Sequence, residues 1–151
     1  KKNSYKNIVN ISSDLGLIAP DQRIYGNFFN KPISYSVVKH GVIGITKYLS
    51  TFYLNDKFRC NCLCPGGVYN GHDPKFVKKL SKLIPFGRMA KLNEYKGAIK
   101  FLCSDMSSYM NGSTLVIDGG RTAWWLGINF LTKETNYIII KNFLIYEYFN
   151  F

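Results

Sequence analysis

Two side chains spaced four positions apart could exchange a proton with a substrate. Tyr35 and Lys39 form a Tyr-x-x-x-Lys pattern, which places both on one face of a helix. A free phenol has a pKa of about 10 and exchanges protons poorly at neutral pH, but a neighbouring ammonium group favours the phenolate. The pair therefore predicts a general acid/base for an alcohol or carbonyl oxygen. A chance pair on a solvated helix face would have the same spacing, so the surrounding elements must decide.

Two turns near this pair also carry residue types that suit chemistry. A Ser-Ser-Asp-Leu-Gly turn closes an apolar run over residues 7–12, and a Pro-Gly-Gly turn closes a second run over residues 58–63. In a parallel sheet, reactive groups gather at the carboxyl ends of the strands. A serine there can hydrogen-bond a substrate oxygen as charge develops on it, and a glycine turn lets the backbone approach a bound ring closely.

The elements that position these residues alternate in type along the chain. Strands are expected at 7–12, 58–63 and 113–117, and helices at 35–54, 74–84 and 93–103. Alternating strands and crossover helices predict an α/β fold with a parallel sheet. The segment from Leu17 to Ser34 is a loop of unusual length for a compact domain, which hints at function.

The helix that follows this loop has its own pattern. Its apolar positions recur every three or four residues, which predicts a buried stripe made of Val38, Val42, Ile45, Leu49 and Phe52. Ser34 is well placed as the N-cap. Gly41 and Gly44 are expected to allow a neighbouring element to approach closely.

Composition narrows the class of protein. The chain has 151 residues, 46% of them hydrophobic and 19% charged, which fits one globular domain and excludes wholesale disorder. The net charge of +11 would suit nucleic acid, but the lysines are scattered and no nucleic-acid module is recognisable, so no nucleic-acid partner is expected. No signal peptide or membrane-length apolar stretch is found. A soluble, cytoplasmic protein is expected.

Three of the four cysteines alternate along one strand. Cys60, Cys62 and Cys64 should therefore point to one face. Zinc sites usually draw on Cys-x-x-Cys turns, which this chain lacks. Buried, reduced thiols are the favoured interpretation, with metal binding as the weaker alternative.

Taken in order, these pieces resemble the short-chain dehydrogenase/reductase family. The matching motifs extend from Lys6 to Trp124 and read NISSDLG, YSVVKHGVIGITK, RCNCLCPGGV, PFGRMA, FLCSDMSSYMNG and VIDGG. The resemblance implies the C-terminal portion of a Rossmann-like, doubly wound parallel sheet over residues 1–124, with the first strand–helix–strand units missing. Residues 125–151 form an atypical tail rich in aromatic residues and isoleucine.

The resemblance also implies roles at the matching positions. Ser13, Tyr35 and Lys39 would be the catalytic residues, with Ser12 as a strand-end residue. The residues that would contact the cofactor, NAD or NADP, are Tyr35, Lys39, Pro65, Gly66 and the backbone of Val68. The cofactor would carry the hydride while the protein moves one proton. No metal is expected, and a homo-oligomer is expected for a full-length protein.

Departures from the family pattern matter as much. The pyrophosphate-binding Gly-x-x-x-Gly-x-Gly loop, the Asn-Ala-Gly segment and the relay asparagine do not occur in these residues. We therefore expect an N-terminally truncated sequence that is catalytically incompetent by itself. The alternatives are an inactive remnant or interaction module and, less favoured, a basic nucleic-acid binder.

The long loop narrows the resemblance to oxidoreductases of flagellin-modification and nonulosonic-acid pathways. A small-molecule substrate, an anionic sugar derivative, would fit the lysine face of the helix at 74–84, which comprises Lys75, Lys78, Lys79 and Lys82. A merely solvated lysine face is equally compatible with this pattern. His40 is expected to be a packing or surface residue, and His72 has no assigned role.

Overall fold

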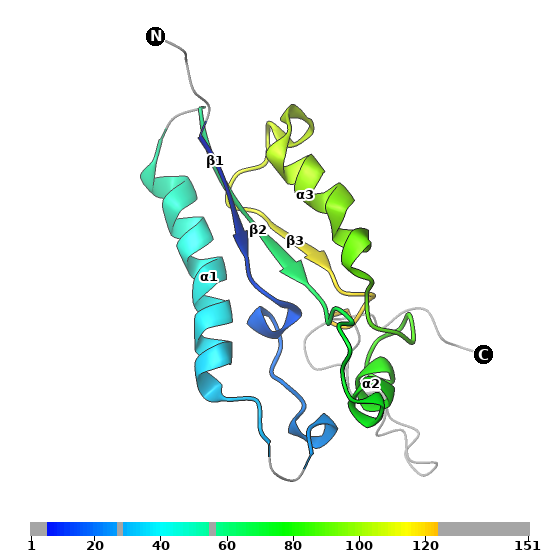
Figure 1. Cartoon of the computed structure of the whole chain (residues 1–151). Coiled ribbons are helices and arrows are strands. Elements are labelled where there is room, and N and C mark those ends of the chain that lie inside the picture. Colours follow the sequence, from blue (N-terminus) through cyan, green and yellow to red (C-terminus); the bar gives the residue numbers. More distant parts are fainter. Residues whose placement is uncertain (1–5, 27–28, 55–56, 124–151) are drawn as a thin grey trace, which may run out of the picture.

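The computed structural model describes residues 6–26, 29–54 and 57–123. Its centre is a parallel sheet of three strands in the order β1-β2-β3 (Figure 1). The strands are β1 (Lys6–Ile11), β2 (Phe58–Pro65) and β3 (Thr114–Ile117). The expected parallel α/β architecture is confirmed. The expected tail at 125–151 lies outside the described residues.

Two helices cover opposite faces of this sheet (Figure 1). Helix α1 (Ile33–Phe52) connects β1 to β2, and α3 (Lys96–Cys103) precedes β3. Successive side chains of a strand point to opposite faces of the sheet. In the central strand β2 nearly all of them are buried, so both faces of this strand are covered. Leu63 packs against Leu102 of α3, while the Asn10 side chain on β1 donates to Thr46 of α1 at 2.9 Å.

The expected buried stripe of α1 is wrong at most of its positions. Val38, Ile45 and Phe52 are all more than half exposed, and the one fully buried residue of this helix is Thr46. Thr46 faces the sheet, where its hydroxyl accepts a hydrogen bond from the Asn10 side chain of β1. These three residues therefore lie on the side of α1 away from the described sheet, whereas Val42 and Leu49 are partly buried. Periodicity located a stripe but could not say which side of the helix the sheet would cover.

The start of α1, and the position at which a neighbouring element approaches this helix closely, also differ from expectation. The helix begins at Ile33, so Ser34 lies inside it and is not its N-cap. A Cβ on Gly41 or Gly44 would meet nothing within 4 Å, whereas one on Gly16 would lie 2.7 Å from the carbonyl oxygen of Lys39. The close approach thus occurs where the turn after β1 crosses α1, one helical turn from Tyr35.

Helix α2 (Pro74–Ser81) lies beyond the carboxyl ends of the strands (Figure 1). Asp73 caps it by accepting from the Lys75 backbone N–H at 3.0 Å. Its apolar side joins a cluster with the long loop, where Ile24 and Leu80 are buried. This apolar side fastens the loop over the strand ends. No helix among the described residues is both long and apolar enough to span a membrane.

Candidate functional site

A cavity of about 320 Å³ opens at the carboxyl ends of β1 and β2. Its wall draws on the turn after β1, the long loop, the first turn of α1, the turn after β2, helix α2 and the turn after β3. The residues used below that line it are Ser12, Ser13, Asp14, Tyr25, Lys31, Tyr35, Pro65, Gly66, Val68, His72, Phe76, Leu80 and Arg121. This is the edge at which parallel sheets gather their ligands.

The two serines after β1 have different hydrogen bonds. Ser12 is buried, and its hydroxyl donates to the Lys39 carbonyl oxygen at 2.6 Å, which fixes the end of β1 against α1. Ser13 caps the short helical turn Asp14–Gly16, since its Oγ accepts from the Leu15 N–H at 3.2 Å. The Ser13 hydroxyl proton is donated to Asp14 Oδ1 at 2.8 Å. Its remaining lone pair is therefore available as an acceptor.

Two lysines flank the ring of Tyr35. Lys39 Nζ lies 5.8 Å from the ring centroid and donates to the Ile11 carbonyl oxygen at 3.1 Å. Lys31 Nζ lies over the same ring at 3.9 Å from its centroid, a cation–π distance. The Tyr35 hydroxyl has no hydrogen-bond partner among the described residues. The phenol thus keeps its hydrogen-bonding capacity within a cationic surrounding.

The turn after β2 offers an unpaired peptide group. Val68 forms an isolated parallel bridge with Ala90, in which the hydrogen bonds use the neighbours of Val68: Ala90 N donates to Gly67 O and Tyr69 N donates to Ala90 O, both at 2.9 Å. The N–H and C=O of Val68 itself have no partner among the described residues. One donor beside one acceptor complements a carboxamide, so this position fits the amide of a nicotinamide.

A buried ion pair closes the cavity near the serine turn. Arg121 Nη1 lies 2.8 Å from Asp14 Oδ2, and the side chains are only 6% and 3% exposed. The pair joins residues 107 positions apart, linking the turn after β3 to the turn after β1. Such pairing lets both charges stay buried.

The long loop contributes further lining residues. Its backbone is held by Gln22, whose amide exchanges two hydrogen bonds with the backbone of Lys31, at 2.9 and 3.1 Å. The Tyr25 ring packs on Phe76 of α2 with centroids 5.6 Å apart. Burial raises the pKa of the Tyr25 phenol, and the nearby Arg121 guanidinium partly offsets this effect. Tyr25 is thus a neutral hydroxyl at physiological pH.

The structure gathers most of the residues that the sequence singled out. Ser13, Tyr35, Pro65, Gly66 and Val68 line one cavity, and Lys39 lies beside it through its bond to Ile11 O. Their roles remain predictions.

Sequence reasoning missed four polar residues of this wall, namely Asp14, Tyr25, Lys31 and Arg121. One signal could have found Arg121, because a basic residue directly after a strand-closing Asp-Gly-Gly turn lies at the carboxyl edge of the sheet. Nothing in the sequence spacing indicated its partner Asp14.

The histidines and the lysine face can also be placed. His40 is exposed, and its Nδ1 lies 2.9 Å from the Ser36 carbonyl oxygen of its own helix, so its expected surface position is confirmed. His72 lines the cavity and stacks on Phe76. Helix α2 faces the cavity with Phe76 and Leu80, and Lys79 donates to the Arg23 carbonyl oxygen at 3.1 Å. None of the four lysines of the lysine face lines the cavity.

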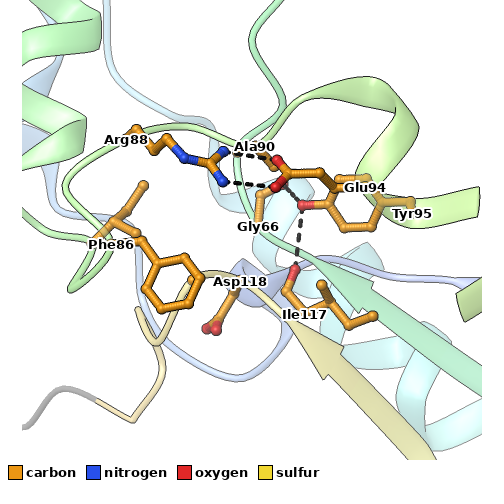
Figure 2. Close-up of a pocket in the computed structure, with 11 residues that line it drawn as sticks. Gly66, Phe86, Arg88, Ala90, Glu94, Tyr95, Ile117 and Asp118 are labelled. Atoms are coloured by element: carbon orange, nitrogen blue, oxygen red, sulfur yellow. Dashed lines mark hydrogen bonds and ion pairs between the residues drawn. The ribbon is translucent and has the colours of Figure 1, made fainter. Parts of the chain in front are cut away.

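A second, smaller cavity of about 70 Å³ lies between the turns after β2 and β3. Figure 2 shows Arg88 and Glu94 facing each other through two parallel bonds of 2.7 Å. The Tyr95 hydroxyl lies 3.3 Å from the Gly66 carbonyl oxygen and 3.2 Å from that of Ile117 (Figure 2). These contacts hold the turn that carries Gly66 in place, behind the larger cavity.

The strand cysteines are buried as expected. Cys60, Cys62 and Cys64 are free thiols without solvent exposure. Cys62 Sγ lies 4.0 Å from Cys64 Sγ, and this contact, followed by burial, raises the pKa of Cys62. No cluster of metal-ligating side chains occurs among the residues with described positions. Their complete burial places these thiols in the core of the domain.

The chain is similar to a known protein family and to members of known function. The family described as "Enoyl-(Acyl carrier protein) reductase" matches residues 2–122. The chain is 35% identical over 121 residues to a post-translational flagellin modification protein A of Campylobacter coli, covering 80% of this chain and 47% of that protein.

Two solved structures share the fold. A short-chain dehydrogenase from Leptospira borgpetersenii with bound NAD+ has a TM-score of 0.74 at 36% identity, covering 80% of this chain and 46% of that one. A gluconate 5-dehydrogenase from Burkholderia cenocepacia in complex with NADP and tartrate has a TM-score of 0.69 at 29% identity, covering 79% and 46%. The chain spans about half the length of the relatives it matches.

Proposed function

The chain belongs to the short-chain dehydrogenase/reductase family, and we propose that its larger cavity is the proton-transfer side of an NAD(P)-dependent oxidoreductase site. One observation carries this proposal. Ser13, Tyr35 and the turn that carries Gly66 and Val68 come from three separate segments and line a single cavity. A phenol flanked by cations, a serine and an unpaired peptide group together suit exchange of a proton beside a bound nicotinamide.

When bound, a nicotinamide cofactor supplies or accepts the hydride. The backbone N–H and C=O of Val68 would hold its carboxamide. Lys39 donates one of its three N–H groups to Ile11 O, so two remain for the ribose hydroxyls. Pro65 and Gly66 would face the ring.

Tyr35 would move the proton of the reaction. In alcohol oxidation its oxygen takes the proton of the substrate hydroxyl, and in carbonyl reduction the phenol returns a proton to the substrate oxygen. Lys31 and Lys39 place two positive charges around its ring, at 3.9 and 5.8 Å from the ring centroid.

Ser13 would orient the substrate oxygen. In the structure its hydroxyl proton points to Asp14 Oδ1. As negative charge develops on the substrate oxygen, rotation of this O–H toward it would stabilise the charge. Ser13 is thus suited to both directions of the reaction.

The substrate class that the cavity favours is a polyhydroxy compound such as a sugar derivative. Several separated polar groups, including Tyr25, His72 and Arg121, line it beside apolar side chains. A relative named for gluconate as substrate supports the same class.

The four free thiols suit a reducing compartment, and the cytoplasm is the proposed location. The apolar face of α1 supports the expectation of a homo-oligomer.

A catalytically inactive relative is the second candidate. The two candidates differ in a simple property, because only the enzyme oxidises or reduces a substrate at the expense of NAD(P)(H).

The test uses one conservative change at the cavity. In the natural protein, Tyr35→Phe removes the phenolic proton and keeps the ring, so turnover with NAD(P) and a panel of polyols should fall by about 10²- to 10⁴-fold. Cofactor binding should be retained. The matched control is Tyr48→Phe, since Tyr48 lies on the same helix and is 62% exposed. Wild-type turnover in Tyr35→Phe would contradict the assignment, and a wild-type protein without any turnover would favour the inactive relative.

A further inference from the structure

One cation of the cavity is not used by the proton transfer described above. Arg121 is 7% exposed and lines the cavity. A guanidinium has five N–H groups, and the side chain of Arg121 donates through Nη1 to Asp14 Oδ2. Its other N–H groups have no partner in the part of the chain that the structure describes. Burying so many unpaired donors is costly unless a ligand or water pairs with them.

These unpaired donors reach open space. Within the described segments, the one side-chain polar atom that is both fully enclosed and without a hydrogen bond is Asn7 Oδ1. The unpaired nitrogens of Arg121 are therefore not sealed in the core, and the open space that Arg121 borders is the cavity. A ligand in this cavity can thus contact the guanidinium directly.

Asp14 does not compete for such a ligand as a free base. Its Oδ1 accepts from the Ser13 hydroxyl and from the Leu15 N–H, each at 2.8 Å, and its Oδ2 accepts from Arg121. With these bonds formed, the ion pair presents mainly donors to the cavity. Donors on a planar guanidinium fork match a carboxylate, which can accept two parallel bonds.

The charge of the wall favours a single negative charge on the ligand. Lys31 and Arg121 are cations and Asp14 is an anion, which leaves one net positive charge among the lining residues with histidine neutral. A carboxylate carries one negative charge, whereas a phosphate monoester carries nearly two at neutral pH. Apolar side chains such as Leu80 fill the rest of this side.

We propose that Arg121 is a specificity-determining residue that binds a carboxylate of the substrate, so that the substrate is a hydroxy acid of the sugar-acid type. This inference rests on the proposed function, because it places the hydroxyl-bearing carbon of the same molecule at Tyr35. Asp14 links the two events: it holds Arg121 through Oδ2 and the Ser13 hydroxyl through Oδ1. The carboxylate end and the reacting oxygen would thereby be kept in register.

The test compares three probes that differ in one group. D-Gluconate, D-sorbitol and D-sorbitol 1-phosphate share a six-carbon polyol and end, at carbon 1, in a carboxylate, a hydroxymethyl group and a phosphate ester. Their dissociation constants would be measured by calorimetry on the natural protein, with cofactor present and without turnover. Because a charge-assisted bond exceeds a neutral one, gluconate should bind about tenfold or more tightly than sorbitol, and more tightly than the phosphate.

Two variants separate recognition from folding. Asp14→Asn removes the carboxylate that pairs with Arg121 and should tighten gluconate binding further, because Arg121 is then uncompensated. The double variant Asp14→Asn/Arg121→Gln replaces a buried ion pair by two neutral amides, which avoids a lone buried charge, and should lose the preference for gluconate over sorbitol. Lys78→Gln is the charge control, since Lys78 is exposed on α2 and does not line the cavity.

Each outcome bears on the inference. A gluconate preference that survives in the double variant, or is lost equally in Lys78→Gln, overturns it. So does equal binding of gluconate and sorbitol, or tighter binding of the phosphate. Circular dichroism of the double variant establishes that it is folded. Failure of the proposed function looks different: gluconate would bind through Arg121 while no alcohol is oxidised in any variant.

Discussion

The two cavities at the carboxyl edge of the sheet contain similar residue types but differ in how their polar groups are paired. In the smaller one, Arg88 and Glu94 satisfy each other twice and the Tyr95 hydroxyl bridges two carbonyl oxygens (Figure 2). In the larger one, the Tyr35 hydroxyl and most N–H groups of Arg121 have no partner among the described residues. Paired groups stabilise a turn, whereas positioned but unpaired groups are available to a ligand. Variants in the two cavities should therefore affect different properties.

The largest expected effect is on turnover, at Lys39 beside the larger cavity. Lys39→Met keeps the length of the side chain but removes the ammonium beside Tyr35 and the donors for a ribose. Turnover should fall by about 10²-fold or more, while the free energy of unfolding changes by about 1 kcal/mol or less, since one exposed hydrogen bond to Ile11 O is lost. Steady-state kinetics and urea denaturation measure the two quantities.

The matched control is Lys47→Met, on an exposed position of the same helix. It should leave both quantities near their wild-type values. A Lys39→Met protein that is strongly destabilised but turns over normally would reverse the comparison between the cavities.

An intermediate effect is expected on stability, at Tyr95 in the smaller cavity. Tyr95→Phe removes a buried hydroxyl that bridges the carbonyl oxygens of Gly66 and Ile117. Losing it should lower the free energy of unfolding by about 1 to 2 kcal/mol, with turnover per folded molecule nearly unchanged. If turnover falls as far as in Tyr35→Phe, the smaller cavity takes part in the chemistry and the distinction fails.

The smallest expected effect is a pH-dependent change in stability at Glu94. Two bonds from Arg88, helped by the Lys91 backbone N–H, lower the pKa of this carboxyl from 4.5 to about 2. Because the folded-state pKa is lowered, the contribution to stability is present above about pH 4.5 and is lost as the pH falls toward 2. Glu94→Gln should thus be slightly less stable than wild type at pH 7, with a gap that narrows below pH 4.5.

Denaturation of both proteins at pH 7 and pH 3.5 measures this gap. The pair is exposed, so the effect at either pH is small. A gap that stays constant or widens on acidification would show that Glu94 does not act through its charge.

The sequence predicted the local parts of this site better than the long-range ones. The Tyr35–Lys39 spacing and the strand-closing turns depend on neighbours along the chain, so pattern alone indicated the parallel sheet and the edge at which ligands bind. The Asp14–Arg121 pair joins residues 107 positions apart, and nothing in either segment indicates the other. The predicted burial of the apolar stripe of α1 was also wrong at most positions, because periodicity shows that a helix has an apolar side but not which neighbour covers it.

The long loop shows the same limit. Its length predicted a functional role, but the cation–π contact of Lys31 with Tyr35 depends on Gln22 holding the Lys31 backbone. Such folding of a loop upon itself leaves no periodic signal.

The most direct test of the central claim follows the hydride itself. The natural protein would be incubated with NAD(P)+ and polyols or sugar acids deuterated at each carbinol carbon, and the nicotinamide product analysed by mass spectrometry. The account predicts deuterium in the nicotinamide ring with wild type and almost none with Tyr35→Phe, although both bind the cofactor. Equal deuterium transfer by Tyr35→Phe, or no transfer by wild type from any substrate of this class, would contradict it.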